Sequence, residues 1–153
     1  PELFQQVAPT EYYRAPEKLL YRFICNQLVF AYDDHQTLSL NSCNLVIPHI
    51  KGLSIKYILA ILNSRIAQFY FKKRFNSIKV LKSHIEQIPI PYIQKNQQEE
   101  ILKYVEILLT DRDKDYIMKI YNELDQKIAA IFNLTQNEYS IILSSMNGEK
   151  LFL

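Results

Sequence analysis

The sequence predicts an α+β fold: a small antiparallel β-sheet followed by a long amphipathic helix and a C-terminal helical bundle. Three observations lead to this prediction. Residues 17–47 are rich in β-branched and aromatic side chains, apolar residues recur at three- and four-residue spacing after Gly52, and the same spacing continues from residue 97 onward. With 153 residues, of which 48% are hydrophobic and 22% charged, the chain is long enough to bury its own core.

The sheet is predicted from short apolar runs separated by turn residues. The runs lie at residues 18–24, 28–32 and 37–40, with turn chemistry at residues 33–36. A further run at residues 45–47 ends at Pro48, which has no backbone N–H to donate. We therefore expect residues 45–47 to be an edge strand or the exit from the sheet.

One helix of about five turns is expected after the sheet, because Ser54 is a suitable N-cap and apolar residues recur from Ile55 to Phe69. Its C-terminal end carries basic residues, where cations also favour the helix dipole. A polar loop is expected at residues 75–79 and an extended segment at residues 88–91, where prolines alternate with isoleucines. Three further helices are predicted at residues 97–109, at residues 116–132, and from a capping box at residues 135–138 to a stop near Asn147 and Gly148.

Composition excludes several classes of protein. Two glycines cannot build a phosphate-binding glycine loop or a dinucleotide-binding turn. The chain contains no apolar run long enough for a membrane span and no secretion signal at Pro1, so we expect a cytoplasmic protein without a membrane partner. The spacing of the two cysteines and three histidines suggests neither a disulfide nor a metal site, and no catalytic motif is found.

Charge is unevenly distributed along the chain. Residues 35–85 contain no Asp or Glu, whereas the segments on both sides are net acidic and reduce the net charge of the whole chain to +2. The basic residues of this acid-free stretch are Lys51, Lys56, Arg65, Lys72, Lys73, Arg74, Lys79 and Lys82. A local field of one sign attracts polyanions, so the stretch indicates a nucleic-acid contact. A solvated basic face without a ligand is the alternative.

The order of the segments resembles the TaqI-like C-terminal specificity domain of adenine-specific DNA methyltransferases in restriction-modification systems, including single-chain enzymes that also cleave. Four segments carry the resemblance: residues 15–22, residues 38–42, residues 59–64 together with 69–71, and residues 88–91. The closing stretch from Glu123 to Glu138 is similar to the helical tail of such proteins. The likeness covers most of the chain from about Tyr12 to Met146.

The resemblance implies a target-recognition module that is not itself an enzyme. The catalytic signature of the family needs a Pro-Pro pair, which this chain lacks. We therefore expect S-adenosylmethionine to bind only in a methyltransferase domain upstream in the same chain, and no cofactor here. The first residue is not Met, which is consistent with a piece of a longer protein. On this basis residues 1–14 are expected to be a linker from the catalytic domain, residues 15–92 the recognition core, and residues 93–153 a helical subdomain.

Double-stranded DNA is the expected partner, with two kinds of contact. The candidate phosphate contacts are Lys72, Lys73, Arg74, Lys79 and Lys82. The candidate base-reading residues are Asn41, Ser42, Asn44, Asn76 and Ser77, for which turn and cap duty is the structural alternative. Two other functions stay open: an RNA-binding accessory domain, and a protein–protein interaction module whose basic charge is incidental.

Overall fold

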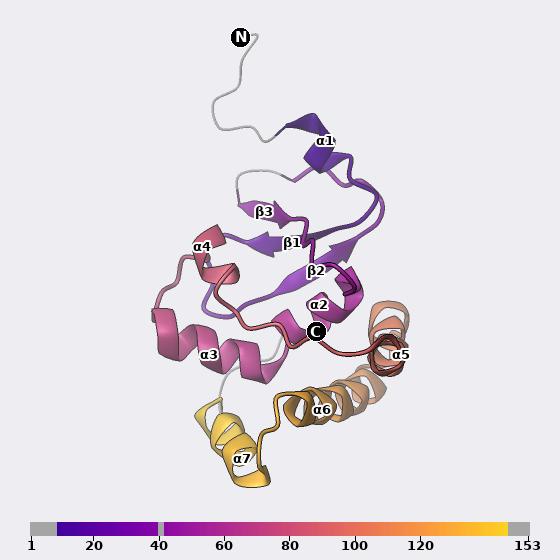
Figure 1. Cartoon of the computed structure of the whole chain (residues 1–153). Helices are drawn as coiled ribbons and strands as arrows, with labels where there is room; N and C mark the ends of the chain where they lie inside the picture. Colours follow the sequence, from indigo (N-terminus) through magenta and orange to yellow (C-terminus); the bar gives the residue numbers. More distant parts are fainter. Residues whose placement is uncertain (1–8, 40–41, 147–153) are drawn as a thin grey trace.

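The computed structural model describes residues 9–39 and 42–146 and confirms the α+β class (Figure 1). Its elements follow in the order α1 (Thr10–Tyr13), β1 (Lys18–Arg22), β2 (Phe30–Asp33), β3 (Cys43–Val46), α2 (Ile55–Leu62), α3 (Arg65–Phe75), α4 (Lys82–Ile85), α5 (Lys95–Thr110), α6 (Lys114–Ile131) and α7 (Gln136–Ser145). The short helices α1 and α4 have no counterpart in the sequence prediction.

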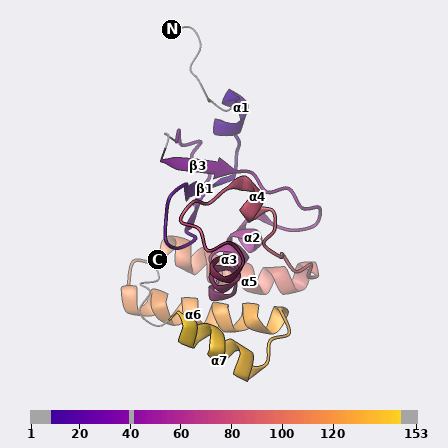
Figure 2. The same ribbon diagram turned by 90° about the vertical axis from the view of Figure 1, so that its left-hand side faces the viewer.

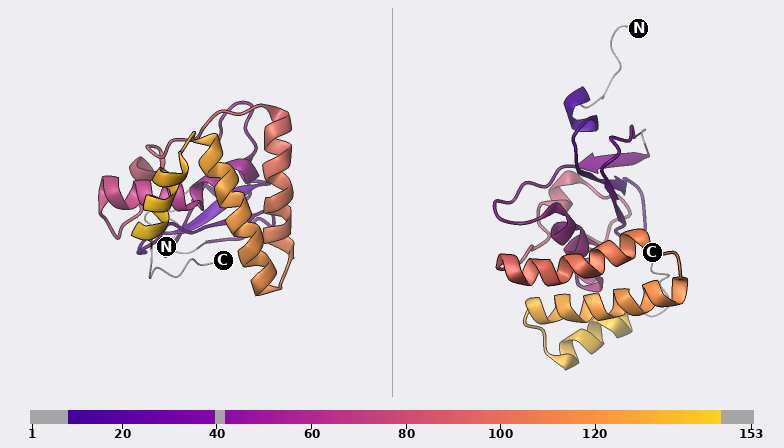
Figure 3. Two further views of the ribbon diagram at one scale, coloured as in Figure 1. Left: turned by 90° about the horizontal axis from the view of Figure 1, so that it is seen from below. Right: turned by 90° about the vertical axis from the view of Figure 1, so that its right-hand side faces the viewer.

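The elements stack in layers. Figure 3 shows α5 and α6 lying one below the other on the side of α2 that faces away from the sheet, with α7 outermost. One hydrophobic core runs through these layers, and Leu19 of β1, Tyr57 and Ile61 of α2 and Ile128 of α6 are almost completely buried in it. The C-terminal helices therefore share their core with the sheet and with the two helices that cover it.

The sheet is antiparallel, with strand order β2-β1-β3. Leu19 pairs with Tyr32 on one side and with Val46 on the other. The third strand of the sheet is β3. The prediction of a strand at residues 37–40 is therefore wrong for the described residues 37–39. The prediction of an edge strand just before Pro48 is confirmed.

The Asp33 carboxylate explains why the chain leaves the sheet at this point. It accepts hydrogen bonds from the Thr37 backbone N–H at 3.0 Å and the Thr37 hydroxyl at 2.6 Å, and it pairs with the buried Lys18 ammonium. These bonds hold residues 34–37 in a turn in which Gln36 has a φ of 55°. Burial alone raises the pKa of Asp33, but the hydrogen bonds from Lys18, Thr37 and the His35 N–H outweigh it and lower the pKa to about 2.

The predicted five-turn helix is two helices, so that prediction is wrong in its continuity. The Ser54 N-cap of α2 is confirmed, because its hydroxyl accepts from the Lys56 N–H at 3.2 Å. The break falls at Asn63, where Ser64 becomes the N-cap of α3 and accepts from the Ala67 N–H at 3.1 Å. Helical periodicity continues across the break, because both helices contribute apolar residues to the same hydrophobic core.

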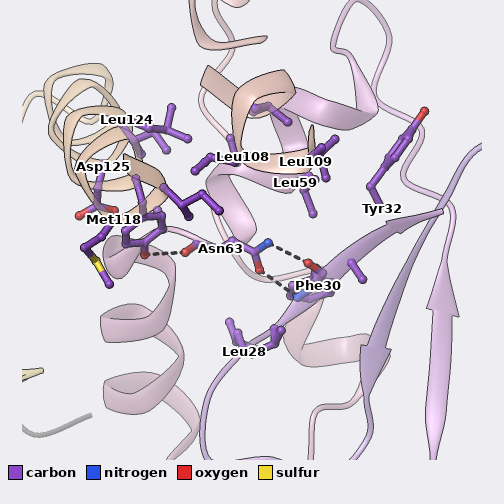
Figure 4. Close-up of a pocket in the computed structure, with 18 of the residues that line it drawn as sticks. Leu28, Phe30, Tyr32, Leu59, Asn63, Leu108, Leu109, Met118, Leu124 and Asp125 are labelled. Carbon is purple, nitrogen blue, oxygen red and sulfur yellow. Dashed lines mark hydrogen bonds between the residues drawn. The ribbon is translucent and has the colours of Figure 1, made fainter. Parts of the chain in front are cut away.

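Three side-chain amides join the helices to the backbone elsewhere. The Asn63 amide accepts from the Phe30 N–H at 2.9 Å and donates to the Phe30 carbonyl at 2.8 Å, as Figure 4 shows. In the same way the Gln68 amide accepts from the Leu28 N–H at 2.8 Å and donates to the Leu28 carbonyl. On α5, Gln98 accepts from the Ser54 N–H at 2.9 Å and donates to the Gly52 carbonyl at 2.8 Å. We call these three bidentate contacts the amide clamps.

A buried ion pair joins α3 to the tail. Asp125 on α6 is 1% exposed and accepts from the Arg65 backbone N–H at 2.8 Å, the Arg65 guanidinium at 3.2 Å and the Tyr139 hydroxyl at 2.6 Å. The Arg65 guanidinium also donates to the Asn122 side chain at 2.7 Å. Because no fully buried side-chain polar atom of the described residues lacks a partner, this pair is satisfied where it is buried, and it fixes how α6 and α7 sit against α3.

The three C-terminal helices are confirmed: α5 and α6 each begin two residues before the predicted start and end one residue from the predicted end. The Thr135 capping box is present, since Thr135 and Glu138 exchange hydrogen bonds between their side chains and backbone N–H groups. The predicted stop near Asn147 and Gly148 lies outside the described residues.

The Gln68 clamp is open to a direct test. Replacing Gln68 with Met keeps the side-chain length and helix propensity but leaves the Leu28 N–H and C=O without their amide partner, so we expect the free energy of unfolding to fall by about 2 to 4 kcal/mol. Urea denaturation followed by circular dichroism measures the change. The control is Gln126→Met on the exposed face of α6, which should alter stability by less than about 0.5 kcal/mol. Equal effects of the two substitutions would contradict a role for the clamp.

Candidate nucleic-acid interface

The basic cluster predicted from the sequence lies at the C-terminal end of α3. Lys72, Lys73 and Arg74 are exposed in the last turn of the helix. The helix ends there because Asn76 adopts the left-handed conformation, with φ 43° and ψ 46°, which Asn tolerates better than most residues. Figure 2 shows this end of α3 pointing toward the viewer, with α4 above it.

The loop after α3 is attached to the end of strand β1. The Cys25 N–H donates to the Ile78 carbonyl at 2.9 Å, and the Val80 N–H donates to the Phe23 carbonyl at 2.8 Å. On the other side of the loop the Phe75 ring stacks on His84 of α4, with 4.3 Å between ring centroids. Residues 76–80 are therefore held as a short extension of the sheet, and the end of α3 is brought to the end of β1.

A surface groove of about 960 Å³ lies where these segments meet. It contains three residues predicted from the sequence, Lys72, Asn76 and Ser77. The remaining lining residues come from the end of β1, the segment that follows it, α3 and the loop: Arg22, Ile24, Cys25, Asn26, Gln27, Val29, Gln68, Phe71 and Ile78. None of the described residues that line the groove is acidic, so they present cations and amides to a ligand.

Two other predicted base-reading residues lie beside this groove, at the start of β3. Ser42 is exposed, and its carbonyl accepts from the Phe23 N–H at 3.4 Å, which puts it next to the end of β1. Asn44 is half-buried and pairs in register with Tyr21. Burial raises the pKa of the Tyr21 hydroxyl, and a hydrogen bond with the Asn44 side chain acts in the opposite direction. The Asn44 amide thus already has an intramolecular partner. Asn41 lies outside the described residues.

Ser77 and Asn76 also have local structural roles. The Ser77 hydroxyl accepts from the Lys79 N–H at 3.0 Å and therefore shapes the turn. Asn76 supplies the left-handed residue at the end of α3 but is exposed, and its side chain lines the groove. Of the five base-reading candidates, Ser42 and Asn76 present exposed side chains on or beside the groove.

Among the described residues, acidic side chains from outside the acid-free stretch pair with some of its cations. Arg65 is buried against Asp125, Lys56 pairs with Glu106 at 2.5 Å, and Lys82 pairs with Glu86 at 3.5 Å across one helical turn. Lys82 is 84% exposed, so that pair is weak and leaves the ammonium accessible. Lys51, Lys73, Arg74 and Lys79 are exposed and have no acidic partner among the described residues. Three of these four cations lie in the last turn of α3 or in the loop that follows it.

The burial of Cys25 beside the groove makes it a poor nucleophile. Desolvation raises the pKa of its thiol, although a backbone hydrogen bond and the Arg22 charge act in the opposite direction. Within residues 9–39 and 42–146, no three His, Cys, Asp or Glu side chains are grouped as a metal site would require. The polar groups that the described groove residues offer a ligand are therefore mainly cations and amides.

A second cavity, of about 730 Å³, shares Gln27, Val29 and Gln68 with the groove and extends between β2, α2, α5 and α6. Figure 4 shows its apolar walls, formed among others by Leu28, Leu59, Leu108 and Met118. None of the residues predicted for DNA contact lines it. In the described part of the chain no buried side-chain polar atom lacks a partner, so this cavity offers a ligand no unpaired buried side-chain group.

The chain belongs to the family of TaqI-like C-terminal specificity domains, whose sequence pattern matches residues 1–90. This match confirms the resemblance found in the sequence. Domains of this family recognise the DNA target in restriction-modification proteins, and a specificity domain is not itself the catalytic part. No curated protein matches the chain. Among the described helices none is both long and apolar enough to cross a membrane.

Sequence reasoning did not identify Arg22 and Asn26 as candidate site residues. Arg22 precedes the acid-free stretch and lies in a segment of net negative charge, so the charge pattern gave no signal for it. Asn26 follows β1 in what reads as an ordinary turn. Only the pairing of residues 23–25 with residues 78–80 brings both of them beside Lys72 and Asn76.

Replacing Lys73 with Ala tests whether the end of α3 contacts phosphate. We expect affinity for duplex DNA to fall by a similar factor on every sequence, and the slope of log affinity against log salt to become shallower by about 0.9. Fluorescence anisotropy at several salt concentrations measures both quantities. The control is Lys119→Ala, an exposed cation on α6, which should leave the slope unchanged. The same loss of slope in both variants would place the contact elsewhere.

Proposed function

We propose that this chain binds duplex DNA with the groove between the end of β1 and the end of α3, and that it thereby supplies target recognition to a DNA-modifying protein. The observation that carries the proposal is the convergence of exposed cations and amides from three separate segments on one groove, in which no lining residue that the structure describes is acidic. Membership in a family of DNA specificity domains supports the same conclusion.

The two kinds of residue have different roles in this proposal. Lys73, Arg74 and Lys79 hold phosphates around the groove, since exposed cations bind the backbone of any sequence. Arg22, Asn26 and Asn76 project groups that match base edges, because Arg bonds to guanine and Asn to adenine in the major groove. Ser42 at the start of β3 extends the reading surface along the sheet end.

The wider context is part of the same proposal. Residues 15–92 act as the recognition core and residues 93–153 as a helical subdomain that supports it through the Gln98 clamp and the Arg65–Asp125 pair. A methyltransferase domain upstream in the same chain binds S-adenosylmethionine and transfers the methyl group to adenine N6. The alternative is that the same protein also cleaves the DNA that this chain recognises. This chain holds the duplex while the target base is rotated out of the stack.

The proposal is tested by measuring duplex binding across salt concentrations. If four or five phosphates are neutralised, the logarithmic salt slope should lie between about −3.6 and −4.5, at roughly −0.9 per phosphate. A slope near zero would instead favour a protein–protein module with incidental charge. Competition with structured RNA separates the remaining function: an RNA-binding domain would prefer the RNA at equal salt, whereas the proposed function predicts preference for duplex DNA.

A substitution at Asn76 distinguishes a role of its side chain in base reading from its role in ending α3. Asn76→Gly removes the amide but keeps the left-handed backbone that ends α3, so we expect affinity to fall on some base sequences by about 1 to 3 kcal/mol and to stay constant on others. Binding selection from a randomised duplex library measures the change. The matched control is Asn133→Gly, which removes an exposed Asn at φ 55° between α6 and α7. An unchanged set of selected sequences after Asn76→Gly would remove this residue from the reading surface.

A further inference from the structure

The ring of His84 is fixed beside the cations at the end of α3. It stacks on the Phe75 ring, with 4.3 Å between centroids and 21° between planes, and it meets the Phe71 ring at a steep angle with 5.8 Å between centroids. Its Nδ1 atom lies 3.1 Å from the Lys79 carbonyl oxygen. Phe75 directly follows Arg74, so these contacts place the imidazole between the last turn of α3 and the loop that carries Lys79.

The two ring nitrogens of His84 have different surroundings. Two backbone groups face Nδ1, the Lys79 carbonyl at 3.1 Å and the Leu81 N–H at 3.4 Å. A proton is assigned to Nδ1, because the carbonyl is the closer of the two groups and a bare nitrogen would place its lone pair against the lone pairs of the oxygen. Nε2 has no hydrogen-bond partner among the described residues, and the ring is partly exposed.

Protonation of the ring decides what Nε2 can bind. In the neutral ring with its proton on Nδ1, Nε2 is an acceptor and cannot donate to a phosphate oxygen. In the imidazolium both nitrogens donate, so Nδ1 keeps its bond to the Lys79 carbonyl while Nε2 donates to an anion. Histidine is the side chain that ordinarily changes charge between about pH 5 and 8, so a phosphate beside the ring can draw this proton from solvent near neutral pH.

The charges around the ring are mostly positive. They come from the end of β1, the last turn of α3, the loop that follows it, and α4 with its C-cap: Arg22, Lys72, Lys73, Arg74, Lys79, Lys82 and Glu86. Glu86 is the acid among them, and it pairs with Lys82 at 3.5 Å. A cationic ring is unfavourable in such a field until a polyanion neutralises it, so DNA binding and protonation of His84 should favour each other.

We propose that His84 is a further phosphate-binding residue of the interface, and that the protein takes up a proton there when it binds duplex DNA. The inference rests on the proposed DNA-binding function and adds to it a residue and a dependence on pH. Because the charged form of the ring is the one that binds, affinity should be higher on the acid side and should fall as the pH rises. An imidazolium that contacts a phosphate also releases one more counterion, which makes binding more sensitive to salt.

The test compares the duplex affinity of the 153-residue chain at about pH 6 and about pH 8. We expect binding to be about three- to tenfold tighter at the lower pH, in the range between an exposed ion pair and a hydrogen bond to a charged group. The slope of log affinity against log salt should also be steeper at the lower pH, by up to about 0.9, because one more phosphate is neutralised. Fluorescence anisotropy measures both quantities.

Two substitutions assign the pH effect to His84. His84→Gln keeps a group that can donate to the Lys79 carbonyl, and His84→Phe keeps a ring that can stack on Phe75, but neither side chain titrates. Both variants should lose the tighter binding and the steeper salt slope at about pH 6. The control is His49→Gln, which removes an exposed histidine in the loop between β3 and α2 and should keep the full pH effect.

A spectroscopic measurement needs no substitution. Nuclear magnetic resonance of the imidazole nitrogens reports which of them carry protons. With duplex DNA bound, the His84 imidazolium should persist to a higher pH than in the free chain, whereas the titration of His49 should be unchanged.

The outcomes distinguish this inference from the proposed function. The inference is overturned if duplex affinity is the same at both pH values, if both His84 variants keep the pH effect, or if DNA leaves the titration of His84 unchanged. In each of those cases salt-dependent duplex binding would persist and the proposed function would stand. Absence of duplex binding in low salt would overturn both.

Discussion

The architecture depends on side-chain amides that replace missing strand partners. β2 is an edge strand, so one side of its backbone has no neighbouring strand. Where α2 and α3 cover this side, its N–H and C=O groups would be left without hydrogen bonds. Asn63 and Gln68 occupy this position, each with one donor and one acceptor directed at a single residue, Phe30 or Leu28. A buried side-chain amide can satisfy the backbone N–H and C=O of one residue at once, so the clamps join a helix pair to a sheet edge without a fourth strand.

The clamps also determine where the candidate interface lies. Asn63 is bound to β2 at the point where α2 ends, and the chain resumes as α3 under the Ser64 cap. With Gln68 held one turn later, α3 runs toward the end of β1, so its last turn brings the cations to the sheet end (Figure 1). The Arg65–Asp125 pair fixes the C-terminal helices against the same helix, although these helices contribute no residue to the groove.

The sequence predicted the parts of the fold that depend on local chemistry. Helix caps at Ser54 and Thr135, the antiparallel sheet and the cluster at the end of α3 all follow from spacing and residue type. The prediction was wrong where a specific side-chain hydrogen bond decides the path of the chain. One continuous helix was expected because periodicity does not reveal that Asn63 bonds to a strand, and a strand at residues 37–40 was expected because propensity does not reveal that Asp33 binds Thr37. The groove residues Arg22 and Asn26 were missed because pairing across about 55 residues places them.

The central claim is that DNA binds at the shared end of β1 and α3, and hydrogen exchange with and without duplex DNA measures this most directly. Mass spectrometry of the exchanged chain resolves short peptides over the described residues. The account predicts slower exchange on DNA binding in residues 22–27 and 72–80, with α5 to α7 unchanged. Protection confined to the C-terminal helices, with no change at the end of α3, would contradict it.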